Sequence, residues 1–324
     1  MRKLLLTILV IAVLAAGWLS FELHSRPSLE RYSDMAFESV PDHDGLRVTF
    51  LGVSTLLLRD ATAAVMIDGF FSRPGLLATA AGKIGPDRQR IQAALAAAGV
   101  DRLDAVVTVH SHFDHAMDTP VVAEITGAVV VGSLSTANIA RGQGIAEDRL
   151  RIVTGTQSMR FGDLTVTLIP SQHFPHGQAM GEITAPLIPP ARALDYLEGG
   201  SFSILVERES KAILVQGSAG HVAGALAGHR ADVVFLGVGL LGSRDDAYRD
   251  EYWRETVTAV GARRVVPIHW DDFTRPLDEP LVALPFLLDD LEASMDFVLD
   301  RAEREGIDVR WPQLWQKVDP FAGQ

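Results

Sequence analysis

Six consecutive residues constrain this chain more than any other stretch of its sequence. They read His110-Ser111-His112-Phe113-Asp114-His115. The apolar and β-branched run 103–109 comes directly before them and predicts a buried strand. Imidazole and carboxylate groups are metal ligands, and donors released at the end of a buried strand are typical of a metal site. The alternative, a polar loop with surface histidines, leaves this cluster without a role.

Charge and cysteine content exclude several classes of partner and ligand. The 324 residues could form one large domain or two small ones. The chain has 41 acidic and 29 basic residues and a formal charge of -12. No nucleic-acid partner is expected, because phosphate binding needs a basic face, although the overall charge leaves a local basic groove open. The chain contains no cysteine, so any metal ion must be held by nitrogen and oxygen atoms.

The first residues resemble a targeting segment. Arg2 and Lys3 precede an apolar run over 4–19, which Thr7 and Gly17 interrupt. A basic start and an apolar core predict a secretory signal peptide or membrane anchor over 1–21, and we favour an uncleaved anchor. The positive-inside rule then predicts a location outside the cytoplasm in the cell envelope, membrane-anchored or periplasmic. The polar stretch 22–45 predicts a tether to a hydrolase domain over 46–324.

Strand and helix patterns alternate through both halves of that domain. Strands are predicted at 47–51, 55–59, 63–67, 103–109, 128–131, 164–169, 201–207, 211–216, 232–236 and 264–268. Helices are predicted at 87–98, 119–126, 246–260 and 286–304. This order suggests an α/β fold with two sheets packed face to face and helices outside. The irregular segment 174–200 is long enough to suggest a functional loop, and we interpret it as a pocket wall or lid.

The His-x-His-x-Asp-His pattern after a buried strand resembles the signature of the metallo-β-lactamase fold superfamily, over roughly residues 46–275. This resemblance implies a four-layer αββα sandwich with metal ions at one edge of its two sheets. The likeness of motif and layout is greatest for the broad branch that includes ascorbate-lactone hydrolases and N-acylphosphatidylethanolamine phospholipases. It implies a hydrolase whose metal-bound hydroxide attacks an ester, lactone, amide or phosphodiester bond of a small-molecule or lipid-like substrate.

The superfamily pattern places the remaining metal ligands on loops that follow strands. His173 follows the strand predicted near 164–170, and His269 follows the one at 264–268. The alternative for each is a histidine in the core whose hydrogen bonds are satisfied by the protein. Two donor sets are implied, namely His110, His112 and His173 for one metal and Asp114, His115 and His269 for the other. We expect one or two zinc ions, although iron and manganese are compatible with the same donors.

One position departs from the commonest superfamily pattern. Many members have an aspartate that bridges the two metals, in a Gly-Asp pair, where this chain has Gly217-Ser218. A serine hydroxyl is a poor ligand, so a looser second metal or a mononuclear form is expected. One metallo-β-lactamase subclass also has serine here and uses two zinc ions. We expect Ser218 to donate a hydrogen bond to a bound water.

Four further residues have proposed supporting roles. Asp114 is expected to orient the attacking water and to shuttle its proton. Asp68 matches an aspartate beneath the metal site that fixes the tautomer of a ligating histidine, with a simple Asp-Gly turn as the alternative. His176 and His221 could line the pocket, donate a proton or replace a ligand, or be ordinary histidines.

Two other functions remain open on the sequence. An oxygen-using non-haem iron enzyme on the same fold would use the same histidine and carboxylate donors. A non-catalytic metal-binding protein would require that the site has decayed, yet only the bridging position differs from the pattern.

Overall fold

The computed structural model describes residues 2–38 and 45–324. Its strands form two mixed seven-stranded sheets. The first sheet has the order β14-β1-β2-β3-β4-β5-β6, with β1 Arg47–Phe50, β2 Leu56–Arg59, β3 Ala64–Ile67, β4 Ala105–Val107, β5 Val129–Gly132, β6 Leu150–Ile152 and β14 Lys317–Val318. The second has the order β13-β12-β11-β10-β9-β8-β7, with β7 Gln157–Phe161, β8 Leu164–Ser171, β9 Ser201–Arg208, β10 Lys211–Gln216, β11 Val233–Gly237, β12 Arg264–Ile268 and β13 Asp308–Val309.

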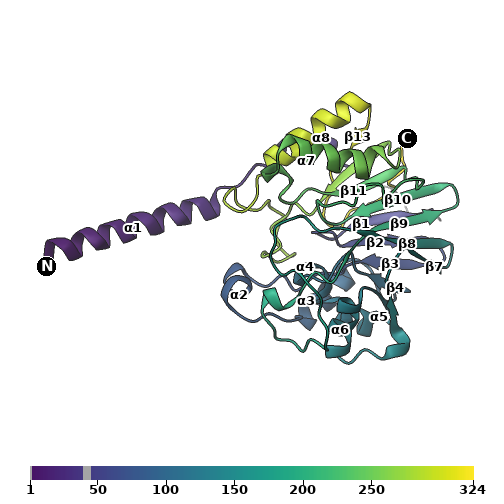
Figure 1. Ribbon diagram of the computed structural model, residues 1–324, viewed down its shortest axis with the longest axis horizontal. Helices are drawn as coiled ribbons and strands as arrows, with labels where there is room; N and C mark the ends of the chain where they lie inside the picture. The colour runs from purple at the N-terminus through teal and green to yellow at the C-terminus, as the bar shows by residue number, and fades with distance from the viewer. Residues whose placement is uncertain (1, 39–44) are drawn as a thin grey trace.

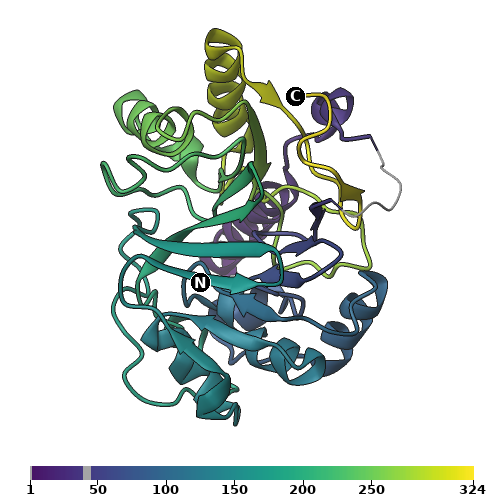
Figure 2. The same ribbon diagram turned by 90° about the vertical axis from the view of Figure 1, so that its right-hand side faces the viewer.

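Helices cover the outer faces of both sheets. The α-helices of residues 45–324 are α2 Leu76–Ala81, α3 Arg88–Ala97, α4 Phe113–Ala116, α5 Thr119–Thr126, α6 Leu134–Gly142, α7 Asp246–Trp253 and α8 Leu291–Glu305. In Figure 1, α7 and α8 lie on one side of the sheets and α3, α5 and α6 on the other. Figure 2 shows the same separation, with the yellow α8 opposite the blue and teal helices. The predicted αββα sandwich is therefore confirmed.

The main hydrophobic core lies between the two sheets. Its members include Val65 and Val107 from the first sheet, and Val215 and Val266 from the second. β4 and β12 are buried along their whole length and pair with parallel neighbours. Strands buried on both faces read as continuous apolar runs, which explains why these strands were recognisable in the sequence. Polar residues that follow such strands are held at one edge of a rigid scaffold.

The N-terminal segment requires a correction. The apolar run predicted to be an anchor forms most of α1 Arg2–His24, which extends away from the rest of the molecule in Figure 1. Among the described residues, however, no helix combines the length and the apolar character needed to cross a membrane. The run of about 18 residues is broken by polar and small residues, whereas a span takes about 20. The location in the cell envelope, anchored or periplasmic, was therefore wrongly predicted.

Part of the predicted tether packs against the domain. A short 3₁₀ helix, Glu30–Met35, buries Tyr32, whose ring stacks on Trp311 with 4.5 Å between the ring centroids. Arg26 forms an ion pair of 2.7 Å with Asp272. Residues 39–44 of the same predicted tether lie outside the described residues.

The last helix begins later than the sequence pattern suggested. The prediction placed its start at 286, but α8 starts at Leu291, with Asp290 as its N-cap accepting a hydrogen bond from the amide of Ala293. The amide of the preceding Asp289 closes a single turn on the carbonyl of Pro285 at 3.0 Å, and its side chain accepts a hydrogen bond from the amide of Leu240 at 3.0 Å. Residues that were expected in a helix therefore form a loop beside the second sheet.

Candidate metal centre

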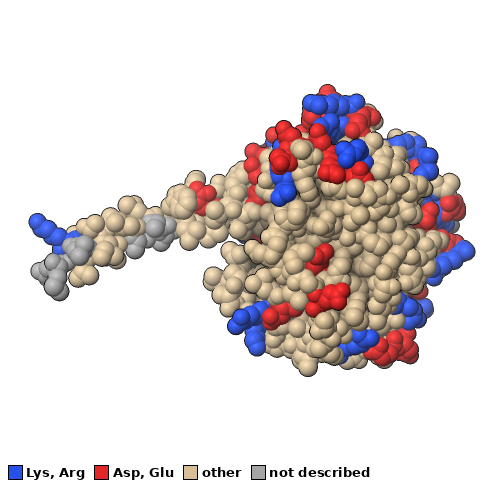
Figure 3. Space-filling model, in the orientation of Figure 1, with Lys and Arg blue, Asp and Glu red and all other residues tan. Residues whose placement is uncertain are grey.

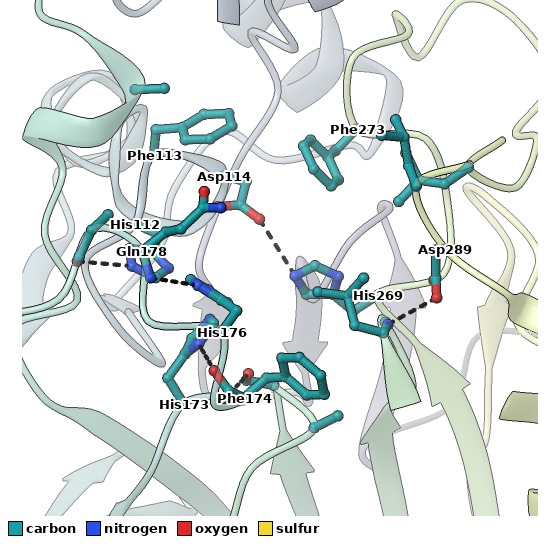
Figure 4. Close-up of a pocket in the computed structure, with 18 of the residues that line it drawn as sticks. His112, Phe113, Asp114, His173, Phe174, His176, Gln178, His269, Phe273 and Asp289 are labelled. Carbon is teal, nitrogen blue, oxygen red and sulfur yellow. Dashed lines mark hydrogen bonds and ion pairs between the residues drawn. The ribbon is translucent and has the colours of Figure 1, made fainter. Parts of the chain in front are cut away.

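The ends of three buried strands bring the motif histidines together. His110 and His112 follow β4, and the short helix α4 then carries Asp114 and His115 into the same space. His173 follows β8 and His269 follows β12, so both reach the centre from the second sheet. Figure 4 shows several of these side chains pointing toward one another around a common pocket.

The donors fall into two compact sets with no shared residue. In the first set, His110, His112 and His173 place one donor atom each within 4.8 Å of one another. The second set, Asp114, His115 and His269, meets the same limit. These are the two sets that the superfamily pattern implied. The ring centroids of His110 and His115 are 3.9 Å apart, so the two sets adjoin.

His110 lies at the centre of this cluster without a hydrogen-bond partner. Its side chain is buried, and neither ring nitrogen has a partner among the described residues. Burial lowers the pKa of His110 well below its ordinary value, and neighbouring imidazoles add to the effect. A buried polar group without a partner is costly. A neutral imidazole has one nitrogen with a free lone pair, and a bound cation would accept that lone pair. His110 is therefore suited to be a metal ligand.

The other two members of the first set each have one nitrogen already committed. Nε2 of His112 donates to the carbonyl of Ala179 at 3.2 Å, and Nδ1 of His173 donates to the carbonyl of Phe174 at 2.8 Å. Because a carbonyl only accepts, the proton must lie on those nitrogens and the opposite nitrogen keeps its lone pair. Burial also lowers the pKa of both rings, that of His173 to about 3. The set therefore presents neutral donors.

Asp68 fixes the tautomer of His115 in the second set. The fully buried carboxylate accepts from Nδ1 of His115 at 2.8 Å and from the hydroxyl of Ser54 at 2.5 Å. Its other oxygen accepts from the amide of Val109 at 2.9 Å. Burial works to lower the pKa of His115, but Asp114 and Asp68 outweigh it and raise the pKa. Nε2 of His115 is directed at the other donors of the set.

The nitrogen and oxygen atoms of the second set crowd one another. Nε2 of His269 lies 3.3 Å from Nε2 of His115 and 3.4 Å from Oδ2 of Asp114. Burial works to raise the pKa of Asp114, but His115 and His269 outweigh it and hold the pKa well below its usual range. A cation between these donors would offset the repulsion between two nitrogen lone pairs and a carboxylate.

The backbone around His269 is shaped to hold that ring in place. His269 has a positive φ of 60°, and its amide donates to the carbonyl of Val53 at 2.8 Å. A Cβ at Gly239 would lie 3.0 Å from Nδ1 of His269 and 2.7 Å from its carbonyl oxygen. Glycine at position 239 is therefore what allows the loop after β11 to pass so close to the ring.

Ser218, His176 and His221 have different surroundings from one another. The Ser218 hydroxyl accepts from the amide of Phe174 at 3.0 Å, which leaves its own proton free to be donated beside the cavity. His176 lines the cavity, with its ring centroid 4.7 Å from that of His173. His221 lies apart, 3.7 Å from Glu251, and is not among the described residues that line the cavity.

A cavity of about 400 Å³ opens beside both donor sets. Phe174, His176, Ala179 and Leu194 on its wall come from the irregular segment 174–200, which confirms that this segment forms a pocket wall. The opposite wall contains Asp289. Sequence reasoning missed this residue because it was placed inside a helix. The sequence did contain a signal, namely two adjacent aspartates at 289 and 290. Only one of them can be the N-cap of a helix, so the other is available for a different role.

The fold and the donor arrangement define a class of protein, namely an αββα protein with a histidine-rich candidate metal centre. A family model described as the beta-lactamase superfamily domain matches residues 65–270. The chain belongs to this family.

Curated relatives match only part of the chain. A metal-dependent hydrolase of Geobacillus thermodenitrificans is 29% identical over 185 residues, covering 55% of this chain and 73% of that protein. An uncharacterized protein of Mycobacterium tuberculosis is 30% identical over 136 residues, covering 41% of this chain and 35% of that protein. The chain thus spans about a third of the length of the mycobacterial relatives it matches.

Solved structures share the fold at low sequence identity. A metallo hydrolase of the archaeon Ignicoccus hospitalis is 15% identical with a TM-score of 0.51, covering 84% of this chain and 97% of that one. A diiron β-hydroxylase of Streptomyces venezuelae is 14% identical with a TM-score of 0.52, covering 86% of this chain and 54% of that one. These likenesses concern the fold alone.

Proposed function

We propose that this protein is a metal-dependent hydrolase that acts on a small-molecule substrate. The observation that carries the proposal is the buried His110, whose two ring nitrogens lack partners among the described residues while the other donors surround it. Membership of the β-lactamase superfamily domain family and the likeness to a metal-dependent hydrolase of Geobacillus thermodenitrificans support it. Zinc is the metal we expect, because the donors are imidazole nitrogens and a carboxylate.

The donor residues have distinct tasks in this proposal. The first set would hold one ion and the second set another. When bound, such ions supply Lewis acidity and make a water molecule a stronger acid near neutral pH. Asp114 lies between His115 and His269 and lines the cavity, so its carboxylate can accept a hydrogen bond from a water and orient it. Asp68 keeps the proton of His115 on Nδ1 throughout.

Groups on the cavity wall can assist departure of the product. Nδ1 of His176 accepts a hydrogen bond from the amide of Gln178 at 2.9 Å, so a proton on this ring lies on Nε2. The Ser218 hydroxyl proton is also available beside the cavity. Either group is placed to donate to a leaving oxygen or nitrogen. Ester, lactone, amide and phosphodiester bonds, including those of lipid-like substrates, remain candidates for hydrolysis.

The test is a hydrolysis panel on protein freed of metal and then reloaded with zinc. We expect hydrolysis of at least one ester, lactone, β-lactam or phosphodiester, lost on chelation and restored by zinc. His112→Ala should lower the rate at least about 100-fold, because the change removes a metal ligand together with its hydrogen bond to Ala179. His229→Ala is the matched control, since His229 belongs to neither donor set. Equal activity in both variants would rule out the proposed centre.

An oxygen-using iron enzyme is the second candidate. The donors contain no thiolate and suit iron as well as zinc, and the diiron β-hydroxylase shares the fold. Elemental analysis of the purified protein separates the two candidates. Iron as the dominant metal, with oxygen consumption and without hydrolysis, would favour the second. A protein that binds metal but turns over no substrate in either assay would instead be a binding protein.

A further inference from the structure

The walls of the cavity are mostly apolar. They include the side chains of Phe113, Phe174, Leu194, Phe273, Leu284 and Leu288. The volume of about 400 Å³ lies in the range of sites for small organic molecules. A substrate that fills this space therefore has an apolar part next to the bond that reacts.

The Asp, Glu, Lys and Arg side chains among the described residues that line the cavity are of one sign. None of the described residues that line it is lysine or arginine, whereas Asp114 and Asp289 both line it. The formal charge of the chain is -12, and Figure 3 shows acidic side chains in the middle of the face that it presents. Metal ions would neutralise one anionic group at the reacting bond. A second anionic group on the substrate would be buried without a cation, which is costly.

Asp289 offers an unused acceptor on this wall. Its side chain is only 4% exposed, and Oδ1 accepts from the amide of Leu240 at 3.0 Å. Oδ2 is buried and has no hydrogen-bond partner among the described residues. Burial raises the pKa of Asp289 to about 6, so the group is largely a carboxylate at neutral pH. In the view of Figure 4, Asp289 lies across the pocket from His112 and His176.

We propose that Asp289 determines substrate specificity by binding an ammonium group, or another hydrogen-bond donor, on the apolar tail of the substrate. The inference rests on the proposed function only in placing the reacting bond at the metal donors. It assigns the substrate to compounds whose tail is neutral or cationic and excludes those whose tail has a carboxylate or phosphate. Asp289 is a specificity residue in this scheme and takes no part in bond cleavage.

A purely structural role for Asp289 is the competing explanation. Its Oδ1 anchors Leu240, whose neighbour Gly239 packs on His269. In that case the charge of Asp289 would not matter to the tail of a ligand, because asparagine retains an oxygen that can accept from Leu240. Asp289→Asn therefore separates recognition of the tail from support of the loop.

The test uses three hydroxamates as binding probes, with the same metal-binding head and apolar tails of equal length. One tail ends in a methyl group, one in an ammonium group and one in a carboxylate, in a series of about four to eight carbons. Dissociation constants are measured by calorimetry on zinc-loaded protein, wild type, Asp289→Asn and Asp290→Asn. Asp290→Asn is the matched control, because Asp290 is exposed, caps α8 and can be replaced by asparagine, an equally good N-cap.

At the best tail length, the wild type should bind the ammonium probe at least about tenfold more tightly than the methyl probe, and the carboxylate probe most weakly. Asp289→Asn should abolish the ammonium preference while the methyl probe binds as before. Asp290→Asn should keep the wild-type order. A preference that survives in Asp289→Asn, or equal binding of all three probes, would overturn the inference. If the protein discriminates between the tails but hydrolyses no substrate, the inference about Asp289 stands and the proposed function is refuted.

Discussion

At the scale of single residues, the centre depends on where each imidazole carries its proton. Carbonyl oxygens set the tautomers of His112 and His173, and the carboxylate of Asp68 sets that of His115. His110 differs, because neither of its nitrogens has a partner among the described residues. The sequence allowed the candidate ligands to be named, but only the folded chain shows which nitrogen of each ring is free.

Replacement of Asp68 by asparagine should impair the second donor set selectively. An amide nitrogen placed against Nδ1 of His115 would donate to that nitrogen, so the ring proton would move to Nε2 and block the lone pair. We expect zinc affinity at the second set to fall roughly 10–100-fold, while the first set keeps its ion. Zinc titration followed by elemental analysis measures this. Unchanged affinity at both sets would show that Asp68 does not control the tautomer.

At the scale of elements, sequence patterns located the strands that carry the donors. β12, which precedes His269, coincides with its predicted range, and so do β10 and α5, which carry no donor. Continuous apolar runs and a proline in the first helical turn identify such elements without knowledge of the fold. The donors that follow these strands were predictable for the same reason.

Other elements have no comparable local signal. The short edge strands β13 and β14 are two residues each and depend on pairing with distant strands. The wall that contains Asp289 was missed because 286–290 has a helical composition, whereas the segment forms a separate turn on Pro285 and contacts Ser25 and Leu240. Propensity is a weak guide where such contacts compete with it.

A buried ion pair joins two loops beneath the second donor set. Arg73 lies 2.7 Å from Asp271, and both side chains are completely buried. Asp271 also accepts from the amide of Val53 at 2.7 Å, and the carbonyl of Val53 accepts from His269. This chain of bonds fixes the loop after β12 against the loop after β1.

Arg73→Met should therefore destabilise the protein strongly. The change leaves Asp271 buried and unpaired, so we expect the free energy of unfolding to fall by about 3–5 kcal/mol. Arg88→Met is the control, because Arg88 pairs with Glu124 on the exposed surface and its loss should cost far less stability. Denaturant titration of both variants measures the difference. Similar losses in the two would argue against the role of the buried pair.

At the scale of the whole molecule, the cluster of neutral imidazoles makes the stability of the metal-free protein depend on pH. His173 has a folded-state pKa of about 3 against an ordinary value of 6.5, because burial lowers it. Between these values the unfolded chain binds a proton that the folded protein does not. The contribution of His173 is therefore present above pH 6.5 and is lost progressively as the pH falls toward 3.

His173→Gln should remove part of this dependence. In chelated protein, the free energy of unfolding of the wild type should fall by a few kcal/mol more than that of the variant as the pH is lowered from about 7 to about 4. His229→Gln serves as the control with the full wild-type slope. Denaturant midpoints at a series of pH values measure the slopes. If His173→Gln loses stability with acid as steeply as the wild type, His173 is not held neutral by the fold.

We propose that both donor sets hold a metal ion and that hydrolysis depends on it. Metal-free protein is dialysed against increasing zinc, and bound zinc and hydrolysis rate are measured on the same samples. We expect the rate to rise with bound zinc until both sets are filled, one ion in each. Hydrolysis that proceeds equally well without metal, or a protein that retains no zinc, would contradict the claim.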